Sequence, residues 1–326
     1  MTKDDQPRSA SDPLIWSALA IVYVVWGSTY LAIRVLAIEH APAFISAGVR
    51  FVIAGAVMLL VGRLRTRRAP ERITPHQLRS SVIVGGALLL GGNGMVVFAE
   101  QRVDSGVAAL MVASMPLWFA LFLWLFHGER LPRPALVGLA LGFGGIALLS
   151  WPSGTSTIAT SGIVALLIAP MAWSAGSIYA RRAPLPRDPF LAAGLETVAG
   201  GILLLAAAAA TGEFRNLDPH LTTRAWLSLS FLIVAGSLVA FTAYMWLVRN
   251  APTSLVSTYA YVNPVVAVLL GSLLLQEPIG VRTVTSAAII IAGVAMMVST
   301  QARRQSDVVE LSSPADAPVP VGIDHK

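Results

Sequence analysis

Apolar residues occur along this chain in ten long runs, separated by short breaks of charged, Pro and Gly residues. The length of the runs identifies the element, because a buried strand needs about 4 to 8 residues whereas about 20 residues cross a bilayer as a helix. The pattern therefore predicts ten transmembrane helices, at residues 14–36, 43–62, 81–99, 105–126, 135–151, 161–180, 190–211, 225–248, 254–275 and 283–300.

The composition agrees with a lipid environment. Of the 326 residues, 56% are hydrophobic and 12% are charged, and the mean hydropathy is +0.71. The net charge of +6 comes from Arg and Lys in short connections and not from one basic face, so we predict contact with the lipid bilayer and none with nucleic acid. The chain has no Cys, and its five His residues show no metal-site spacing, so no metal or other cofactor is expected.

The two ends of the chain are polar. The first run is longer than the core of a signal peptide and is not followed by a convincing cleavage site, so we predict that it is retained after an N-terminal tail at residues 1–13. Residues 301–326 lack the apolar surface that a folded segment needs, which predicts a disordered C-terminal tail.

The distribution of Lys and Arg predicts the orientation, because these residues are retained on the cytoplasmic side of a membrane. With both termini in the cytoplasm, the cytoplasmic segments contain 17 of the 23 Lys and Arg residues, and the outer segments contain five. Residues 63–79, after the second helix, are the richest in Arg. The prediction is a multi-pass protein of a bacterial plasma (inner) membrane with both termini cytoplasmic.

The second half of the chain repeats the first at a shift of 146 to 148 residues. The paired residues keep their order: Trp26 with Trp173, Pro116 with Pro264, and Glu129 with Glu277. Because each unit contains five helices, the second unit must enter the membrane from the opposite side. The fold class is therefore an all-α membrane protein of two inverted five-helix repeats, at residues 14–151 and 152–300, with a binding site near the midplane between them.

Several short motifs carry a specific resemblance. They are Trp26-Gly27-Ser28-Thr29-Tyr30, the repeated prolines, Gly128-Glu129-Arg130-Leu131 and Gln276-Glu277-Pro278-Ile279. With them, residues 14–300 resemble the EamA-type transporters of the drug/metabolite transporter superfamily, most closely the bacterial aromatic amino acid exporters. The resemblance implies ten helices, a central cavity and export of amino acids or related metabolites. The second repeat reads Trp173-Ser174-Ala175-Gly176 where the first reads Trp-Gly-Ser, so strict functional symmetry is not implied.

Polar and aromatic residues at mid-membrane depth are the candidate substrate-binding groups, because a zwitterionic solute must exchange its hydration for protein partners there. The alternative for each is helix packing, in which Ser and Asn also serve. The candidates are Trp26, Ser28, Tyr30, Arg50, Asn93, Ser114, Trp118, Trp173, Ser177, Glu196, Phe241, Tyr244, Tyr259 and Asn263.

Arg50 and Glu196 are the two strongly charged candidates, and they occupy equivalent positions of the repeats. Intramembrane charge is costly, which favours a functional role: carboxylate capture for Arg50 and proton or ammonium handling for Glu196. Extension of each side chain toward its nearer membrane surface is the alternative. Counting along the helices separates the two by about 10 Å in depth, so an ion pair requires both side chains to stretch.

Two further pairs have conformational or structural interpretations. Pro116 and Pro264 each remove a helical hydrogen bond, which predicts kinks that act as hinges or are static. Glu129 and Glu277 lie at helix ends, where a carboxylate can accept from unpaired backbone N–H groups, so we interpret them as structural caps.

Three classes of function are compared. An inverted repeat favours a secondary transporter for small molecules, either amino acids and related metabolites or, as the alternative, drugs and other metabolites of the same superfamily. A membrane enzyme would need clustered catalytic groups, and a channel would need a ring of like residues or a filter loop, and neither pattern is present. The oligomeric state stays open, and a monomer suffices for this architecture.

The charge distribution leads to a first prediction. In this cysteine-free chain, single cysteines placed at Ser9, Thr66 and Ser306 should resist an impermeant thiol reagent in intact cells and react after lysis, because all three lie in cytoplasmic segments. Labelling of any of the three from outside would overturn the orientation.

Overall fold

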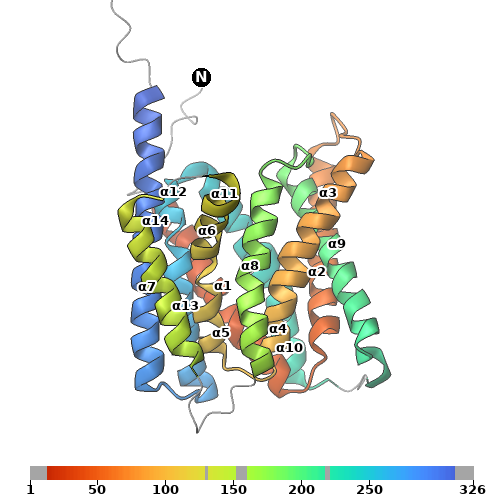
Figure 1. The fold of residues 1–326 in the computed structure, drawn as a ribbon. Helices are drawn as coiled ribbons and strands as arrows, with labels where there is room; N and C mark the ends of the chain where they lie inside the picture. The colour runs from red at the N-terminus through yellow and green to blue at the C-terminus, as the bar shows by residue number, and fades with distance from the viewer. Residues whose placement is uncertain (1–12, 129–130, 152–159, 217–220, 313–326) are drawn as a thin grey trace, which may run out of the picture.

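The computed structural model describes residues 13–128, 131–151, 160–216 and 221–312, and every regular element in these residues is a helix (Figure 1). Six helices are continuous. They are α1 (Pro13–Ile38), α2 (Ala43–Arg65), α7 (Arg133–Ser150), α8 (Thr160–Ala180), α9 (Pro189–Ala210) and α14 (Val281–Ser312).

The other spans are composite. The third consists of α3 (Pro75–Gly85), η1 (Gly86–Gly94) and α4 (Met95–Ala99), and the fourth of α5 (Ser105–Val112) and α6 (Met115–His127). The eighth consists of α10 (Thr223–Phe231), η3 (Leu232–Val239) and α11 (Ala240–Asn250). The short α12 (Thr253–Val256) precedes α13 (Tyr259–Leu275), and the 3₁₀ turn η2 (Glu213–Asn216) follows α9.

Nine of the spans in the described residues are long and apolar enough to cross a membrane. The remaining predicted span is the shorter apolar helix α13, which continues from α12 across a break at Ser257 and Thr258. The chain is thus an all-helical membrane protein of about ten helices.

Two predicted boundaries differ from the structure by more than three residues. The third span begins at Pro75 and not at residue 81, because Thr74 and Gln77 form a capping box and Pro75 takes the first helical position. Helix α14 continues to Ser312 beyond the predicted end at residue 300, into the segment predicted to be disordered, and residues 313–326 lie outside the described ones.

Both η1 and η3 are π-helical, and they occupy corresponding positions in the third and eighth spans. A π-helix is rare, and its widened turn often marks a functional position. Each one packs against the first two helices of the other half: η1 against α8 and α9, and η3 against α1 and α2. The two halves therefore contribute equivalent irregular segments to the contact between them.

The most extensive helix contact joins α2 to α9 and depends on glycine. Gly55 of α2 lies so close to Val198 that an added Cβ would be 2.7 Å from its backbone nitrogen, and Gly201 of α9 stands in the same relation to Val52 at 2.8 Å. Gly48 adds a third close approach, to the carbonyl of Gly201. Small residues let helices approach closely in a bilayer, where apolar side chains gain little by leaving lipid.

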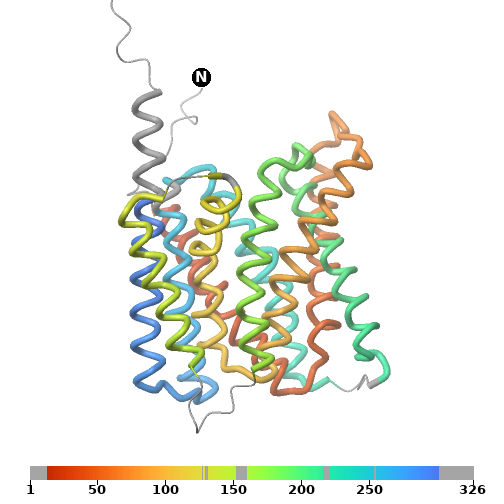
Figure 2. Tube along the Cα trace, viewed as in Figure 1, coloured from red at the N-terminus to blue at the C-terminus, as the bar shows by residue number. Residues whose placement is uncertain are grey.

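Helices α7 and α14 form a second close pair at one edge of the molecule (Figure 2). Gly138 and Gly293 face each other there, each against the carbonyl of the other. The main hydrophobic core extends from this pair into the contacts between α1, α4, α5 and α8, where it includes Leu110 and Leu166. Below, the membrane side on which α1 ends is called the Ile38 side, and the opposite side, on which α2 ends, the Arg65 side.

The glycine contact gives a second prediction. Gly55→Ala should lower the thermal unfolding midpoint of the detergent-solubilised protein, because the new methyl group meets the backbone of α9, which cannot rotate away. Overpacking of this kind costs about 1 to 3 kcal/mol. Gly144→Ala on α7 is the matched control: no atom lies within 4 Å of its Cβ position, so its midpoint should stay unchanged or rise. Equal midpoints for Gly55→Ala and wild type would show that this contact is not tight.

Candidate functional site

The structure places more than half of the predicted site residues in three regions. Three aromatic residues meet between α1, α11 and α13, Arg50 lines a pocket that opens toward the Ile38 side, and residues of α6 and α8 lie within the packing of the fourth and sixth spans.

The aromatic group consists of Trp26, Tyr244 and Tyr259. The ring centre of Trp26 lies 5.1 Å from that of Tyr244 and 5.4 Å from that of Tyr259, and the two tyrosine rings are 5.7 Å apart. The Trp26 indole donates a hydrogen bond of 3.1 Å to the carbonyl of Gly236 in the π-helix η3. The sequence prediction that these residues converge is consistent with this geometry, in which the π-helix supplies a backbone acceptor.

On the Arg65 side of this group, α1 is attached to the eighth and ninth spans. The Tyr23 and Thr258 hydroxyls form a hydrogen bond, and Leu19, Val22 and Leu247 form a buried apolar cluster. The aromatic group therefore lies on a packed contact of α1 with the eighth and ninth spans.

Arg50 is buried, with 7% of its surface exposed, and is held at two points. Its Nε donates to the Ser237 hydroxyl of η3 at 2.8 Å, and its guanidinium carbon lies 4.6 Å from the ring centre of Phe51. Ser237 in turn donates to the Leu232 carbonyl at 3.0 Å. None of the described residues forms an ion pair with Arg50. A buried guanidinium with no counter-charge is a strong site for an anionic group.

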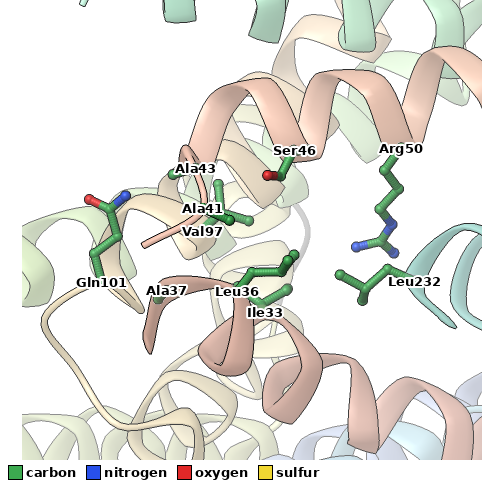
Figure 3. A pocket seen from close by; sticks show the side chains of 11 residues that line it. Ile33, Leu36, Ala37, Ala41, Ala43, Ser46, Arg50, Val97, Gln101 and Leu232 are labelled. Atoms are coloured by element: carbon green, nitrogen blue, oxygen red, sulfur yellow. The ribbon is translucent and has the colours of Figure 1, made fainter. Parts of the chain in front are cut away.

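The pocket beside Arg50 lies between α1, α2, α4 and η3 (Figure 3). It contains about 350 Å³ of space free of atoms, including the part open to the surroundings. Its walls are mainly apolar, with Ile33, Leu36 and Leu232 near the guanidinium and Ser46 and Gln101 as polar groups. Arg50 is about two helical turns, or about 10 Å, below the start of α2, so it marks the deep end.

Glu196, the counterpart of Arg50, has a different environment. Its side chain is partly buried on α9, and no described residue forms an ion pair with it. The serine that holds Arg50 also has no equivalent, because the 146-residue shift relates Ser237 to Gly91. The two charged positions are thus built differently, and they do not form the stretched ion pair with each other.

Several candidates on α6 and α8 lie in helix contacts. The Trp118 ring packs edge-on against Phe143 of α7, at 4.8 Å between ring centres. The Ser114 hydroxyl donates to the Met111 carbonyl at 2.5 Å, and Trp173 lies over Gly92 of η1. These contacts are equally compatible with packing and with the wall of a cavity that opens in another conformation.

The remaining candidates lie outside the aromatic group and the pocket beside Arg50. Ser28 donates within its own helix to the Val24 carbonyl at 2.7 Å, and Tyr30 packs against the main core. The others are partly buried: Asn93, Ser177 and Phe241.

The two prolines behave differently. The fourth span is broken just before Pro116, as a kink there requires, whereas Pro264 lies inside the continuous helix α13. The corresponding break precedes α13 at Ser257 and Thr258.

Two of the predicted residues have buried polar atoms without partners. The Asn263 Oδ1 and Trp118 Nε1 atoms are fully buried and accept or donate no hydrogen bond. Nearly all buried polar atoms are paired in folded proteins, so such atoms often face a ligand. Both residues also lie near the middle of their spans.

The sequence interpretation missed Ser237 and Glu100. Ser237 gave no signal because a serine in an apolar helix resembles a packing residue. Glu100 lies one residue past the predicted end of the third helix and was therefore taken as part of the connection, yet its side chain is fully buried. No group of three His, Cys, Asp or Glu residues in the described part could hold a metal ion.

Carboxylates also connect the halves at helix starts. Glu277 accepts from the Ser105 and Gly106 backbone N–H groups at 2.9 and 3.2 Å, so it caps α5 of the first half and not the helix that follows it. Glu213 accepts from the Phe44 N–H at 3.2 Å at the start of α2. These hydrogen bonds are the capping contacts predicted for Glu277, made to a helix of the other half. Glu129 lies outside the described residues.

Comparison with known proteins gives matches over most of the chain. A sequence profile of the EamA-like transporter family matches residues 14–151 and again residues 160–299. The inner membrane transporter YedA of Escherichia coli (strain K12) is 39% identical over 259 residues, which are 79% of this chain and 82% of the relative. The transporter YvbV of Bacillus subtilis (strain 168) is 24% identical over 88% of this chain and 92% of its own length. A solved crystal structure has a similar fold, with a TM-score of 0.58 over 91% of this chain and 100% of that chain at 21% identity.

Proposed function

The chain belongs to the EamA-like transporter family, and from this premise we propose that it exports amino acids, aromatic ones among them, or related small metabolites by alternating access through a site near the membrane midplane. Membership makes it a secondary transporter of the inner membrane and not an enzyme, with two family units in one chain. The observation that carries the proposed substrate class is the Arg50 guanidinium, which is buried at the deep end of the pocket and has no ion-pair partner among the described residues.

Arg50 suits a carboxylate for a geometric reason. The guanidinium presents parallel N–H groups that match the two oxygens of a carboxylate, and Ser237 occupies Nε, so the terminal nitrogens remain for the solute. A substrate carboxylate would also relieve the cost of the uncompensated charge.

The apolar part of the solute has matching surroundings. The walls formed by Ile33, Leu36 and Leu232 can contact a hydrophobic side chain, and the aromatic group around Trp26 offers rings for stacking deeper in the membrane. Asn263 Oδ1 could accept from an ammonium group. The binding of one small amphiphile by both halves follows from this arrangement.

Alternating access requires two units that rock against each other, and we propose that the two halves are inverted repeats. Five helices per unit support this, as does the exchange of equivalent contacts: η1 packs on α8 and α9, and η3 packs on α1 and α2. The positions of Lys and Arg support a cytoplasmic Arg65 side, so that the pocket beside Arg50 opens to the outside.

Multidrug efflux is the second candidate and depends on Glu196, the acidic residue inside a described span. A lipophilic cation would be repelled by Arg50 in the pocket, which favours anionic or zwitterionic solutes. A cation preference in transport assays would reverse this order.

The third prediction tests Arg50 in proteoliposomes supplied with a panel of labelled amino acids and drugs. Arg50→Gln should raise the half-saturating concentration of carboxylate-bearing substrates about 10- to 150-fold, because a hydrogen bond to a charged group is worth about 1.5 to 3 kcal/mol. Arg50→Lys keeps the positive charge but loses the two parallel N–H groups of the guanidinium. Its affinity should therefore lie between that of Arg50→Gln and that of the wild type. Ser237→Ala should have a smaller effect in the same direction.

The control for Arg50 is Arg215→Gln, which removes an exposed arginine from η2 on the same side of the membrane. It should transport with wild-type affinity. Wild-type affinity for every carboxylate substrate in Arg50→Gln, at matched expression, would refute the assigned role.

The fourth prediction concerns the unpaired midplane atoms. Asn263→Ala and Trp118→Ala should each weaken substrate binding by about 1 to 3 kcal/mol, or about 5- to 150-fold, if they contact the solute. Packing residues would instead lower the folded yield before they change substrate preference. Leu148→Ala, at an exposed position of α7, is the control at matched thermal stability. Unchanged rate and affinity in both variants would contradict the midplane site.

A further inference from the structure

The Glu100 carboxyl group is the most unusual acidic group in the described residues. Its residue is 0% exposed, and neither carboxyl oxygen has a hydrogen-bond partner. It directly follows the span that ends at Ala99, on the Ile38 side. An ionised carboxylate in such surroundings would cost several kcal/mol. In this packing the group therefore needs a bound proton or a cation.

Arg34, the cation whose charge acts on Glu100, forms no ion pair with the Glu100 carboxyl group. Arg34 of α1 donates from Nη1 to the backbone carbonyl of Glu100 at 2.5 Å, and its Nη2 lies 3.6 Å from a carboxylate oxygen of Asp104. The guanidinium thus fixes the turn between α4 and α5. None of the described cationic side chains forms an ion pair with the Glu100 carboxyl group, so an ionised form would have no direct counter-ion.

A second carboxyl group, that of Glu277, lies within electrostatic range of Glu100. Glu277, after α13, accepts from the Ser105 N–H at 2.9 Å, from the Ser105 hydroxyl at 2.9 Å and from the Gly106 N–H at 3.2 Å. Glu277 thus has three hydrogen-bond donors, whereas both carboxyl oxygens of Glu100 are buried without a partner. Of the two groups, Glu100 is the one whose oxygens gain a partner when a proton binds.

The other charged and titratable groups nearby do not change this assignment. Tyr30 of α1 is within electrostatic range of Glu100. Arg102 rests over the Phe98 ring at 4.9 Å. The described part of α8, which also packs on α4, has Tyr179 near its Arg65 end as its titratable side chain, and Arg50 of α2 lies deeper.

The net effect of these surroundings is to raise the pKa of the Glu100 carboxyl group. Burial raises the pKa of Glu100 well above its ordinary value of 4.5, and the charge of Glu277 raises it further, against a smaller opposing effect of Arg34. The pKa of Asp104 is raised by the same causes, burial first.

We propose that Glu100 is a proton-binding site of this transporter, which holds a proton while the Ile38-side ends of α1, α5 and α13 are packed together and releases it when they separate. The helices involved belong to both halves, so the proton is linked to a contact that must open and close in alternating access. The site follows from the geometry of the carboxyl group, and its use in driving transport rests on the proposed function.

The sign of the linkage follows from the raised pKa in the packed arrangement. Below the ordinary value near 4.5 the group is protonated in both arrangements, and the packed contact has its full stability. Between the ordinary pKa and the raised pKa of the packed arrangement, Glu100 must take up a proton when the helix ends pack together. The equilibrium constant for packing therefore falls about tenfold for each unit of pH rise in this range. Glu100→Gln, a neutral isostere, should pack independently of pH.

The fifth prediction tests the proton directly, by infrared spectroscopy of the full chain in lipid nanodiscs at neutral pH. The wild type should show the carbonyl stretch of a protonated carboxylic acid, and Glu100→Gln should lose that band. Glu39→Gln, an acidic position on the same side that pairs with Arg224, should retain it. Identical spectra for the wild type and Glu100→Gln would overturn the proposal, because Glu100 would then be ionised.

The conformational part of the test uses spin labels at two exposed positions, Ile38→Cys and Ile279→Cys, in this cysteine-free chain. The population in which the two spin labels are close together should fall as the pH rises in the wild-type background. It should stay constant in Glu100→Gln and still fall in Glu39→Gln. A population that responds to sodium ions and not to pH would refute proton binding in favour of a cation.

Transport measurements separate the two proposals. If a substrate is carried, an outward-acid pH gradient should alter its flux in the wild type and in Glu39→Gln, and the relative effect of the gradient should be lost in Glu100→Gln. A gradient effect of the same size in Glu100→Gln would overturn the role of Glu100 in coupling. Failure of the wild type to carry any amino acid or metabolite contradicts the proposed function and leaves the infrared result as the test of the site.

Discussion

Close contact between helix backbones is the constraint on which this structure depends, because lipid provides almost no hydrophobic drive for helices to associate. The contact of α2 with α9 meets it with glycines at equivalent repeat positions, Gly48 and Gly55 on one helix and Gly194 and Gly201 on the other. Each leaves room for the backbone or a branched side chain of the partner helix. The hydrogen bonds that join the halves lie mainly at the helix ends and at the π-helices.

At the helix ends, carboxylates of one half complete the backbone hydrogen bonding of the other. On the Ile38 side, Glu213 and Glu277 accept from the first N–H groups of α2 and α5. On the Arg65 side, Glu71 accepts from the Arg187 and Asp188 N–H groups before α9, at 3.0 and 3.5 Å. Unpaired amides at a helix start need an acceptor, and a carboxylate also suits the positive end of the helix dipole. These hydrogen bonds join the two halves on both membrane sides, near the ends of the helices.

The sequence predicted the spans because their apolar runs have the length that a bilayer requires. It placed Trp26, Tyr244 and Tyr259 at a common depth among other candidates, and their mutual contact comes from the structure. It could not predict the π-helices, since the extra residue in each turn depends on packing against the other half and leaves no mark in Gly86–Gly94 or Leu232–Val239. Long-range partners such as Ser237 for Arg50 were hidden for the same reason.

The asymmetry of the two charged positions completes the argument about function. A duplicated chain begins with equivalent sites, yet Arg50 of the first half is oriented by Ser237 of the second half. For Glu196 of the second half, the position of the first half that corresponds to Ser237 is Gly91. If both positions were only structural, equivalent surroundings would favour similar side chains and similar partners. A solute with a carboxylate at one end and an apolar group at the other needs a cation on one side only, and the cost of burying that cation is offset when the solute binds. The unequal halves thus favour a zwitterionic or anionic amphiphile over a symmetric or cationic one.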